Sequence, residues 1–183
     1  MRALDASLRI PPSTLARKIL CLAYLPSPFE AEGRFRAQAF HAIAVVRVIA
    51  RHLKMGYRLS SIERGGSGYR IDLLFEAVST GRTRIVEVKG SKQMREVHKI
   101  QAALYSHAES DEIVVSNREI DEVLVRDFIE QIRRRAEVTR QLLASDPARA
   151  ATAYAPHDDV CYTCANLGCP YLSSTTQPPL SSN

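Results

Sequence analysis

The segment RIVEVKGSK, residues 84–92, combines the pattern of a buried strand with two charged residues. Val86 and Val88 are β-branched and apolar, which is typical of a strand that packs into a core. Glu87 and Lys89 alternate with them and therefore share the opposite face of the strand. Charged side chains are rarely placed in a buried strand unless they are paired, bound to a metal or used in chemistry. The segment therefore predicts both a core strand and a functional site on it.

The preceding segment YRIDLLFE, Tyr69–Glu76, has the pattern of a strand and is the expected hairpin partner. A two-residue loop at Thr80–Gly81 would place Asp72 directly opposite Lys89. Opposed side chains in a hairpin point to the same face of the sheet. Asp72, Glu87 and Lys89 are therefore expected to cluster. A slip of the register by one residue would move Asp72 to the other face.

Two carboxylates and one lysine on one face of a sheet favour a divalent-metal site. Hard cations such as Mg²⁺ and Mn²⁺ prefer carboxylate oxygens. Such a metal polarises a phosphoryl oxygen and generates a hydroxide nucleophile. A lysine beside it stabilises charge that develops on the phosphate or orients the attacking water. The alternative is an ordinary ion pair on a half-exposed strand.

The rest of the chain predicts a small mixed sheet flanked by helices, in the α/β class. The helix that starts the chain is expected to be capped by Ser13, and ERGGSG is expected to form a turn between the first two strands. Gln101 and Tyr105 lie four residues apart on one face of the helix that follows the charged strand. The expected helices are Pro11–Leu25, Glu30–Leu53, Met94–Ala108 and Val123–Leu143, and the expected strands are Tyr57–Glu63, Tyr69–Glu76, Thr83–Lys89 and Glu112–Ser116.

The composition sets limits on the location and partners of the chain. No run of ~18 apolar residues occurs, so no membrane span is expected. The N-terminus lacks the apolar segment of a secretory signal, so the protein is expected to be cytoplasmic. The net charge of +5 is compatible with a polyanionic partner. In the cytoplasm, metal binding or catalysis is a better default for its four cysteines than disulfide formation.

The cysteines have the spacing of metal ligands. Cys161, Cys164 and Cys169 form the pattern C-x₂-C-x₄-C, and Cys21 lies far upstream. C-x₂-C is a spacing found in metal knuckles. Four thiolates suit either zinc or an iron–sulfur cluster, and the spacing does not decide between them.

The motifs GYRIDLL, VEVKG and QAALY together resemble the RecB-like branch of the PD-(D/E)XK nucleases. The resemblance implies a restriction-endonuclease-like core. It implies that Asp72 and Glu87 bind Mg²⁺ or Mn²⁺ and that Lys89 acts in catalysis. It also implies that Gln101 and Tyr105 position DNA or the attacking water. The family often carries a further metal-binding histidine on the preceding helix, and the residue at that place here is His41.

The segment PSTLARKILC and the three C-terminal cysteines resemble the CRISPR-associated Cas-four family, although the last spacing of that family is usually one or two residues longer. The resemblance implies a [4Fe–4S] cluster that joins the N-terminal helix to the C-terminal segment; [2Fe–2S] and Zn²⁺ remain alternatives. The expected ligands are Cys21, Cys161, Cys164 and Cys169.

The same resemblance implies a single RecB-like nuclease domain over residues 1–172. Its nuclease core spans residues 29–143, its cluster-binding ends are residues 13–25 and 144–172, and residues 173–183 form a disordered tail. The implied function is a metal-dependent exonuclease that cuts single-stranded DNA and processes fragments for CRISPR spacer acquisition, with the CRISPR adaptation integrase as a partner. The alternatives are a stand-alone RecB-like repair exonuclease and a catalytically silent, zinc-stapled DNA-binding module.

Overall fold

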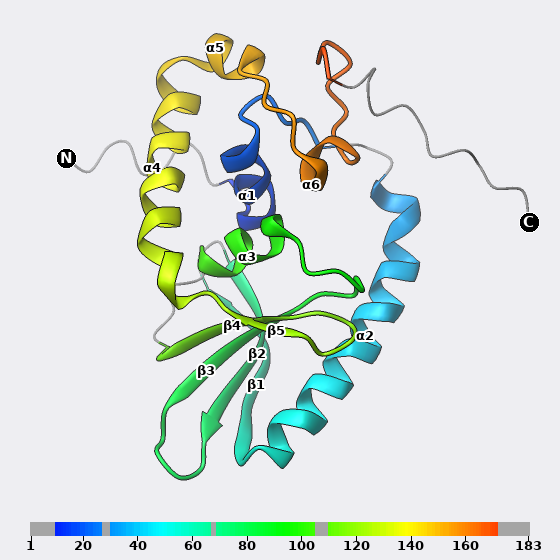
Figure 1. Ribbon diagram of the computed structural model, residues 1–183, viewed down its shortest axis with the longest axis vertical. Helices are drawn as coiled ribbons and strands as arrows, with labels where there is room; N and C mark the ends of the chain where they lie inside the picture. Colours follow the sequence, from blue (N-terminus) through cyan, green and yellow to red (C-terminus); the bar gives the residue numbers. More distant parts are fainter. Residues whose placement is uncertain (1–9, 27–29, 67–68, 105–109, 172–183) are drawn as a thin grey trace, which may run out of the picture.

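The computed structural model describes residues 10–26, 30–66, 69–104 and 110–171 of the chain. It contains a five-stranded sheet flanked by helices (Figure 1), which confirms the predicted mixed α/β class. The elements in chain order are α1 (Pro12–Leu20), α2 (Glu30–Lys54), β1 (Tyr57–Gly66), β2 (Tyr69–Ala77), β3 (Thr83–Val88), α3 (Glu96–Ala103), β4 (Glu112–Ser116), β5 (Glu122–Leu124), the 3₁₀ turn η1 (Arg126–Phe128), α4 (Ile129–Ser145), α5 (Pro147–Thr152) and α6 (Asp158–Cys161).

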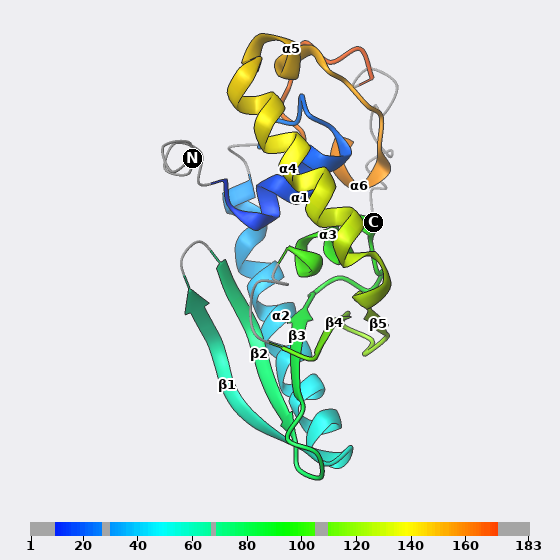
Figure 2. The ribbon, with the colours of Figure 1, turned by 90° about the vertical axis from the view of Figure 1, so that its left-hand side faces the viewer.

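The strands lie side by side in their order along the chain, from β1 to β5. β1, β2 and β3 form antiparallel pairs, β3 and β4 are parallel, and β5 is antiparallel to β4. A parallel pair needs a crossover connection, and α3 lies in that connection. Figures 1 and 2 show α1, α3, α4, α5 and α6 gathered at one end of the sheet, whereas α2 runs along its length.

The two faces of the sheet carry separate cores because side chains alternate along each strand. On one face, Ala44 and Val48 of α2 pack in one cluster with residues such as Phe75 and Val86. On the other face, the core cluster includes Ile85 and residues from β2, β4 and α3. β3 is therefore covered on both sides, as the apolar pattern around Glu87 and Lys89 predicts.

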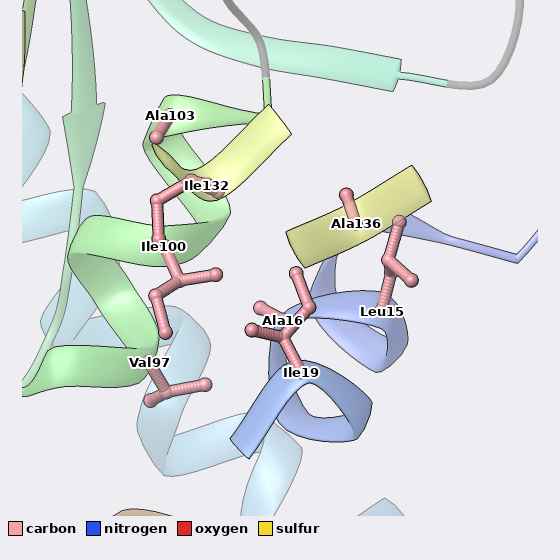
Figure 3. Packing of buried hydrophobic residues seen from close by; sticks show 8 residues of the cluster. All are labelled: Leu15, Ala16, Ile19, Val97, Ile100, Ala103, Ile132 and Ala136. Carbon is pink, nitrogen blue, oxygen red and sulfur yellow. The ribbon is translucent and has the colours of Figure 1, made fainter. Parts of the chain in front are cut away.

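A second helical layer covers α3 on the side away from the sheet. Its buried residues come from α1, α3 and α4, which are far apart in the sequence but share one cluster (Figure 3). Ala16 and Ala136 are among them, and their small side chains let the helices approach closely. This layer ties the beginning of the chain to α3 and so determines where α3 sits over the sheet. The cluster consists of Leu15, Ala16, Ile19, Val97, Ile100, Ala103, Ile132 and Ala136.

The register of the β2–β3 hairpin differs from the prediction. Leu73 pairs with Val86 and Glu76 pairs with Thr83. The backbone N–H of Ala77 also donates to the carbonyl of Arg82 at 2.8 Å, so the loop closed by this bond has four residues, 78–81, instead of the expected two. Gly81 adopts a positive φ of 70° in this loop, where its missing Cβ avoids strain. Extending the observed register by one pair sets Asp72 opposite Glu87, not opposite Lys89. The shift is an even number of residues, so Asp72 stays on the predicted face.

Several predicted boundaries are wrong for identifiable reasons. Ser13 makes no side-chain cap, because the helix begins at Pro12 with Pro11 at the N-cap position, and α1 ends at Leu20. β1 extends through Gly66 into the expected turn. The expected start of the last long helix at Val123 instead forms β5, which pairs with β4, and η1 follows before α4 begins.

Part of the predicted site and the predicted tail lie outside the described residues. Tyr105 and residues 173–183 belong to this part of the chain. Among the helices that the structure describes, none combines the length and the apolar character that crossing a membrane requires.

Candidate active site at the end of β3

Asp72 lies where β2 and β3 stop pairing. The last ladder pair in this direction is Leu73 with Val86. Beyond it, Oδ2 of Asp72 accepts a hydrogen bond from the backbone N–H of Val88 at 2.8 Å. The side chain thus takes the place of a strand partner for that N–H group, which fixes the carboxylate against β3.

His41 reaches the same carboxylate from α2. Its Nε2 lies 3.3 Å from Oδ2 of Asp72, and the two side chains are 34% and 13% exposed. The hydrogen bond to Asp72 raises the pKa of His41, and partial burial opposes this effect. Ala44 and Val48, on nearly the same side of α2, are buried against the sheet and hold this part of the helix in place. His41 therefore lies on the side of α2 that faces the sheet.

Glu87, Lys89 and Gln101 form a closed triangle of hydrogen bonds. Lys89 Nζ donates to Oε1 of Glu87 at 2.6 Å and to Oε1 of Gln101 at 2.9 Å. Gln101 Nε2 donates to the same oxygen of Glu87 at 2.9 Å. Glu87 and Lys89 come from the end of β3, and Gln101 comes from α3 above it. The helix that follows the charged strand therefore supplies the third member of this triangle.

Glu87 is the most deeply placed charged group of this site. It is 3% exposed, and its buried Oε2 atom has no hydrogen-bond partner among the residues that the structure describes. Burial raises the pKa of Glu87 to about 7; Lys89 lowers it and the negative charge of Asp72 raises it. An unpartnered carboxylate oxygen in the interior is costly, and a cation beside it would remove that cost.

The donor set of this site suits a hard divalent cation. Asp72 and Glu87 offer carboxylate oxygens and His41 offers a nitrogen, and Oε2 of Glu87 is the oxygen left open. In the part of the chain that the structure describes, however, no three His, Cys, Asp or Glu side chains converge closely enough to hold a metal. The residues fit such an ion chemically, and binding would require their side chains to move closer together.

Asp159 is a contributor to this region that sequence reasoning missed. Its Oδ2 accepts hydrogen bonds from the backbone N–H groups of Glu96 at 2.6 Å and of Val97 at 3.3 Å, which are the first residues of α3. Beside it, the guanidinium of Arg95 lies 4.5 Å from the ring centre of Tyr162. A cap supplied from so far along the chain has no local sequence signal. It ties the cysteine-containing segment to the helix that carries Gln101.

The basic residues near this site are partly engaged within the protein. Lys99 pairs with Glu96 at 3.2 Å, and Arg95 stacks on Tyr162. His98 accepts a hydrogen bond from the backbone N–H of Arg95, and its burial, with the nearby charge of Lys89, lowers its pKa to about 3. His98 is therefore neutral and serves as a hydrogen-bond acceptor at the start of α3.

The segment that contains Cys21 lies beside the segment that contains Cys161 and Cys164. The backbone N–H of Ala165 donates to the carbonyl of Leu25 at 2.9 Å. Pro26 and Cys164 form an isolated antiparallel β-bridge. Cys21 is buried. Burial is the main cause that raises the pKa of its thiol, and the thiolates of Cys164 and Cys161 add to the effect.

The structure thus brings Cys21 close to two of its three expected partners. Cys169 lies in the same C-terminal segment, where its backbone N–H donates to Asn166, and Nδ2 of Asn166 donates to the carbonyl of Ala23 at 2.9 Å. Within the described ranges the four thiols do not yet form a group arranged for a metal. The shared four-cysteine site therefore stays a prediction.

Searches against protein-family models, curated proteins and solved structures found no match to this chain. The functional argument consequently rests on the residues themselves. Its strongest element is the convergence of Asp72, Glu87, Lys89 and Gln101 from two strands and a helix at one end of β3.

Proposed function

We propose that this protein is a metal-dependent DNA nuclease with a PD-(D/E)XK active site. The observation that carries the proposal is Glu87, a buried carboxylate that Lys89 and Gln101 hold through one oxygen, while its other oxygen has no hydrogen-bond partner in the described part of the chain. An ordinary ion pair on a half-exposed strand does not explain that open oxygen, whereas a carboxylate that awaits a cation does.

The residues have separate roles in this proposal. Asp72 and Glu87, together with His41, would hold Mg²⁺ or Mn²⁺. When bound, such an ion supplies Lewis-acid polarisation of the phosphate and lowers the pKa of a bound water. Lys89 carries the positive charge that stabilises the phosphate during attack. Gln101 keeps the Lys89 ammonium in place, because its Oε1 accepts from Nζ at 2.9 Å.

For the substrate we propose single-stranded DNA, cut from an end as an exonuclease, with processing of fragments for CRISPR spacer acquisition as the biological process. This part rests on the sequence resemblance to the Cas-four family and on the net charge of +5. A stand-alone repair exonuclease would use the same active site. Binding of the purified protein to the CRISPR integrase would favour the role in spacer acquisition over the role in repair.

We propose that the four cysteines hold an iron–sulfur cluster. The approach of Cys21 to the segment of Cys161 and Cys164 supports a shared site. A zinc-stapled and catalytically silent DNA-binding module is the alternative. The two are separated by iron, sulfide and zinc analysis of protein purified without oxygen, together with its visible absorption spectrum.

The nuclease proposal is tested with end-labelled single-stranded DNA and Mn²⁺. The Glu87→Ala variant should lose cleavage by roughly 10³-fold or more while it still binds DNA. Gln101→Ala should lose less, because Gln101 orients Lys89 and does not contact the cation. The matched control is Glu76→Gln, which changes a carboxylate on β2 that pairs with Arg58 away from the site. Cleavage by Glu87→Ala at the wild-type rate would refute the proposal.

A further inference from the structure

The α2 helix has a second apolar stripe on the side that does not face the sheet. Its members recur at alternating steps of four and three residues, which is the spacing of a coiled-coil seam. The large side chains in it are well exposed: Ile43 by 49%, Val46 by 66% and Leu53 by 52%. We name this set the outer stripe. It consists of Ala39, Ile43, Val46, Ala50 and Leu53.

Packing against the residues that the structure describes does not explain the outer stripe. The opposite side of α2, with Ala44, Val48 and His52, is buried and already packs against the sheet. Five of the 13 large apolar side chains that are exposed in the described part of the chain lie between Phe40 and Met55. Scattered exposed apolar residues are ordinary, but a contiguous set of this kind marks an interaction surface.

One flank of the outer stripe is basic. Arg47, Arg51 and Lys54 follow it, and no acidic residue occurs between Phe40 and Lys54. Arg51 lies 4.0 Å from Glu122. Arg47 and Lys54 have no ion pair or hydrogen bond with any residue that the structure describes, so their charges are available to a partner.

A hollow opens on this basic flank. It has a volume of about 510 Å³ and is bounded by α2 and by the loop between β4 and β5. Ile120 of that loop has a φ of 66°, a left-handed conformation that strains a β-branched residue. Arg51 holds it there by donating from Nη1 to the Ile120 carbonyl at 3.0 Å. The lining residues are Arg47, Ala50, Arg51, Lys54, Met55 and Ile120.

We propose that the outer stripe and this hollow form a docking surface for an amphipathic helix of a partner protein, with carboxylates along one flank of its apolar face. The four-three spacing matches a helix that packs nearly parallel to α2. The basic flank selects an acidic partner. In a second, antiparallel copy of this chain, Arg47 and Lys54 would meet like charges. A bound nucleic acid would leave the apolar side chains of Ile43, Val46 and Leu53 in water or place them against charged phosphates, so it would not bury them.

This inference is independent of the proposed nuclease activity. His41 belongs to the inner side of α2 and contacts Asp72, whereas the outer stripe points away from that site. Substitutions on the stripe should therefore leave DNA cleavage unchanged.

The test uses a designed peptide of about three heptads with Leu at both seam positions and Glu at the flanking positions. Fluorescence anisotropy with the full chain should show saturable binding that weakens between about 0.05 and 0.5 M salt. Val46→Glu should weaken binding by roughly tenfold or more. The matched control is Val138→Glu, which changes a valine on α4 that is 54% exposed.

A second variant tests the charge argument without disturbing the apolar contact. The double variant Arg47→Glu with Lys54→Glu should prefer a peptide that carries Lys in place of Glu. Absence of binding to the acidic peptide, or equal binding of both peptides to the wild type, would overturn the proposal. So would displacement of the peptide by single-stranded DNA, or a concentration-dependent dimer that Val46→Glu dissociates in sedimentation.

Discussion

At the end of β3 the carboxylate site is held by side chains from several elements, whereas the cysteine end is held mainly by backbone hydrogen bonds between short segments. Asp72, Glu87 and Gln101 are fixed by a sheet and by a helix packed in two core layers. Cys21 lies in a small cluster whose other buried residues are Ala23, Tyr24 and Val160. The sheet and α3 therefore hold the carboxylate site together without a ligand, and under the proposed function the cysteine site would depend on a bound cluster or metal to complete it.

Replacement of Cys21 is expected to have the largest effect on folding stability. Cys21→Ser should release the cluster or zinc and lower the free energy of unfolding by several kcal/mol, because metal binding at such a site is coupled to folding. Iron, sulfide and zinc content and a thermal melt would measure it. The matched control is Ala23→Ser, which places the same hydroxyl at a position that is 2% exposed. Equal melting of both variants would show that the cysteine end needs no ligand.

At the carboxylate site, burial of the ionised Glu87 should destabilise the folded protein as long as no cation is bound. The pKa of Glu87 is about 7 in the folded protein and 4.5 as its ordinary value. Below pH 4.5 the group is protonated in both states and contributes no penalty. Between pH 4.5 and about 7 the unfolded state ionises this carboxyl while the folded state keeps it protonated, so the metal-free protein loses stability across this window, by roughly 3 kcal/mol in total, and no further above it.

Glu87→Gln removes this titration. The difference in unfolding free energy between the variant and the wild type should therefore shift by about 3 kcal/mol in favour of the variant between pH 4.5 and pH 9. Urea unfolding in the presence of a chelator would measure it. Added Mn²⁺ should stabilise the wild type and not the variant. A difference that does not change with pH would mean that Glu87 is not held in an unfavourable environment.

The sequence predicts the carboxylate site better than it predicts the elements around it, such as β5 and the cap of α3. Strands alternate with a period of two, so the face shared by Asp72 and Glu87 survived a wrong loop length that shifted the register by two residues. A shift by one would have separated them. The part played by Gln101 came from the family resemblance, and its place on the helix after β3 brings it to Glu87 and Lys89. Local periodicity was sufficient for Asp72 and Glu87 because both lie in one hairpin, whereas His41 reaches the site from α2.

The features that the sequence did not reveal depend on contacts between distant segments. β5 forms at Glu122–Leu124 because β4 offers an edge, which overrides the helical pattern that starts at Val123. The cap of α3 comes from Asp159, which stands in a segment without periodicity. Side-chain hydrogen bonds over such separations are decided by packing and leave no trace in spacing or composition.

Asp159 gives the smallest expected effect and connects the two regions. Asp159→Ala removes the acceptor for two N–H groups at the start of α3, which should lower the free energy of unfolding by about 1 kcal/mol. Asp159→Asn should lower it less, since an amide oxygen still accepts. The control is Asp158→Ala, which changes the exposed neighbouring residue. If the carboxylate site depends on the C-terminal segment, Asp159→Ala should also lower kcat for DNA cleavage without raising KM, because α3 carries Gln101 to Lys89. Equal stability and equal kcat in the two alanine variants would show instead that the sheet holds α3 by itself and that the two regions are independent.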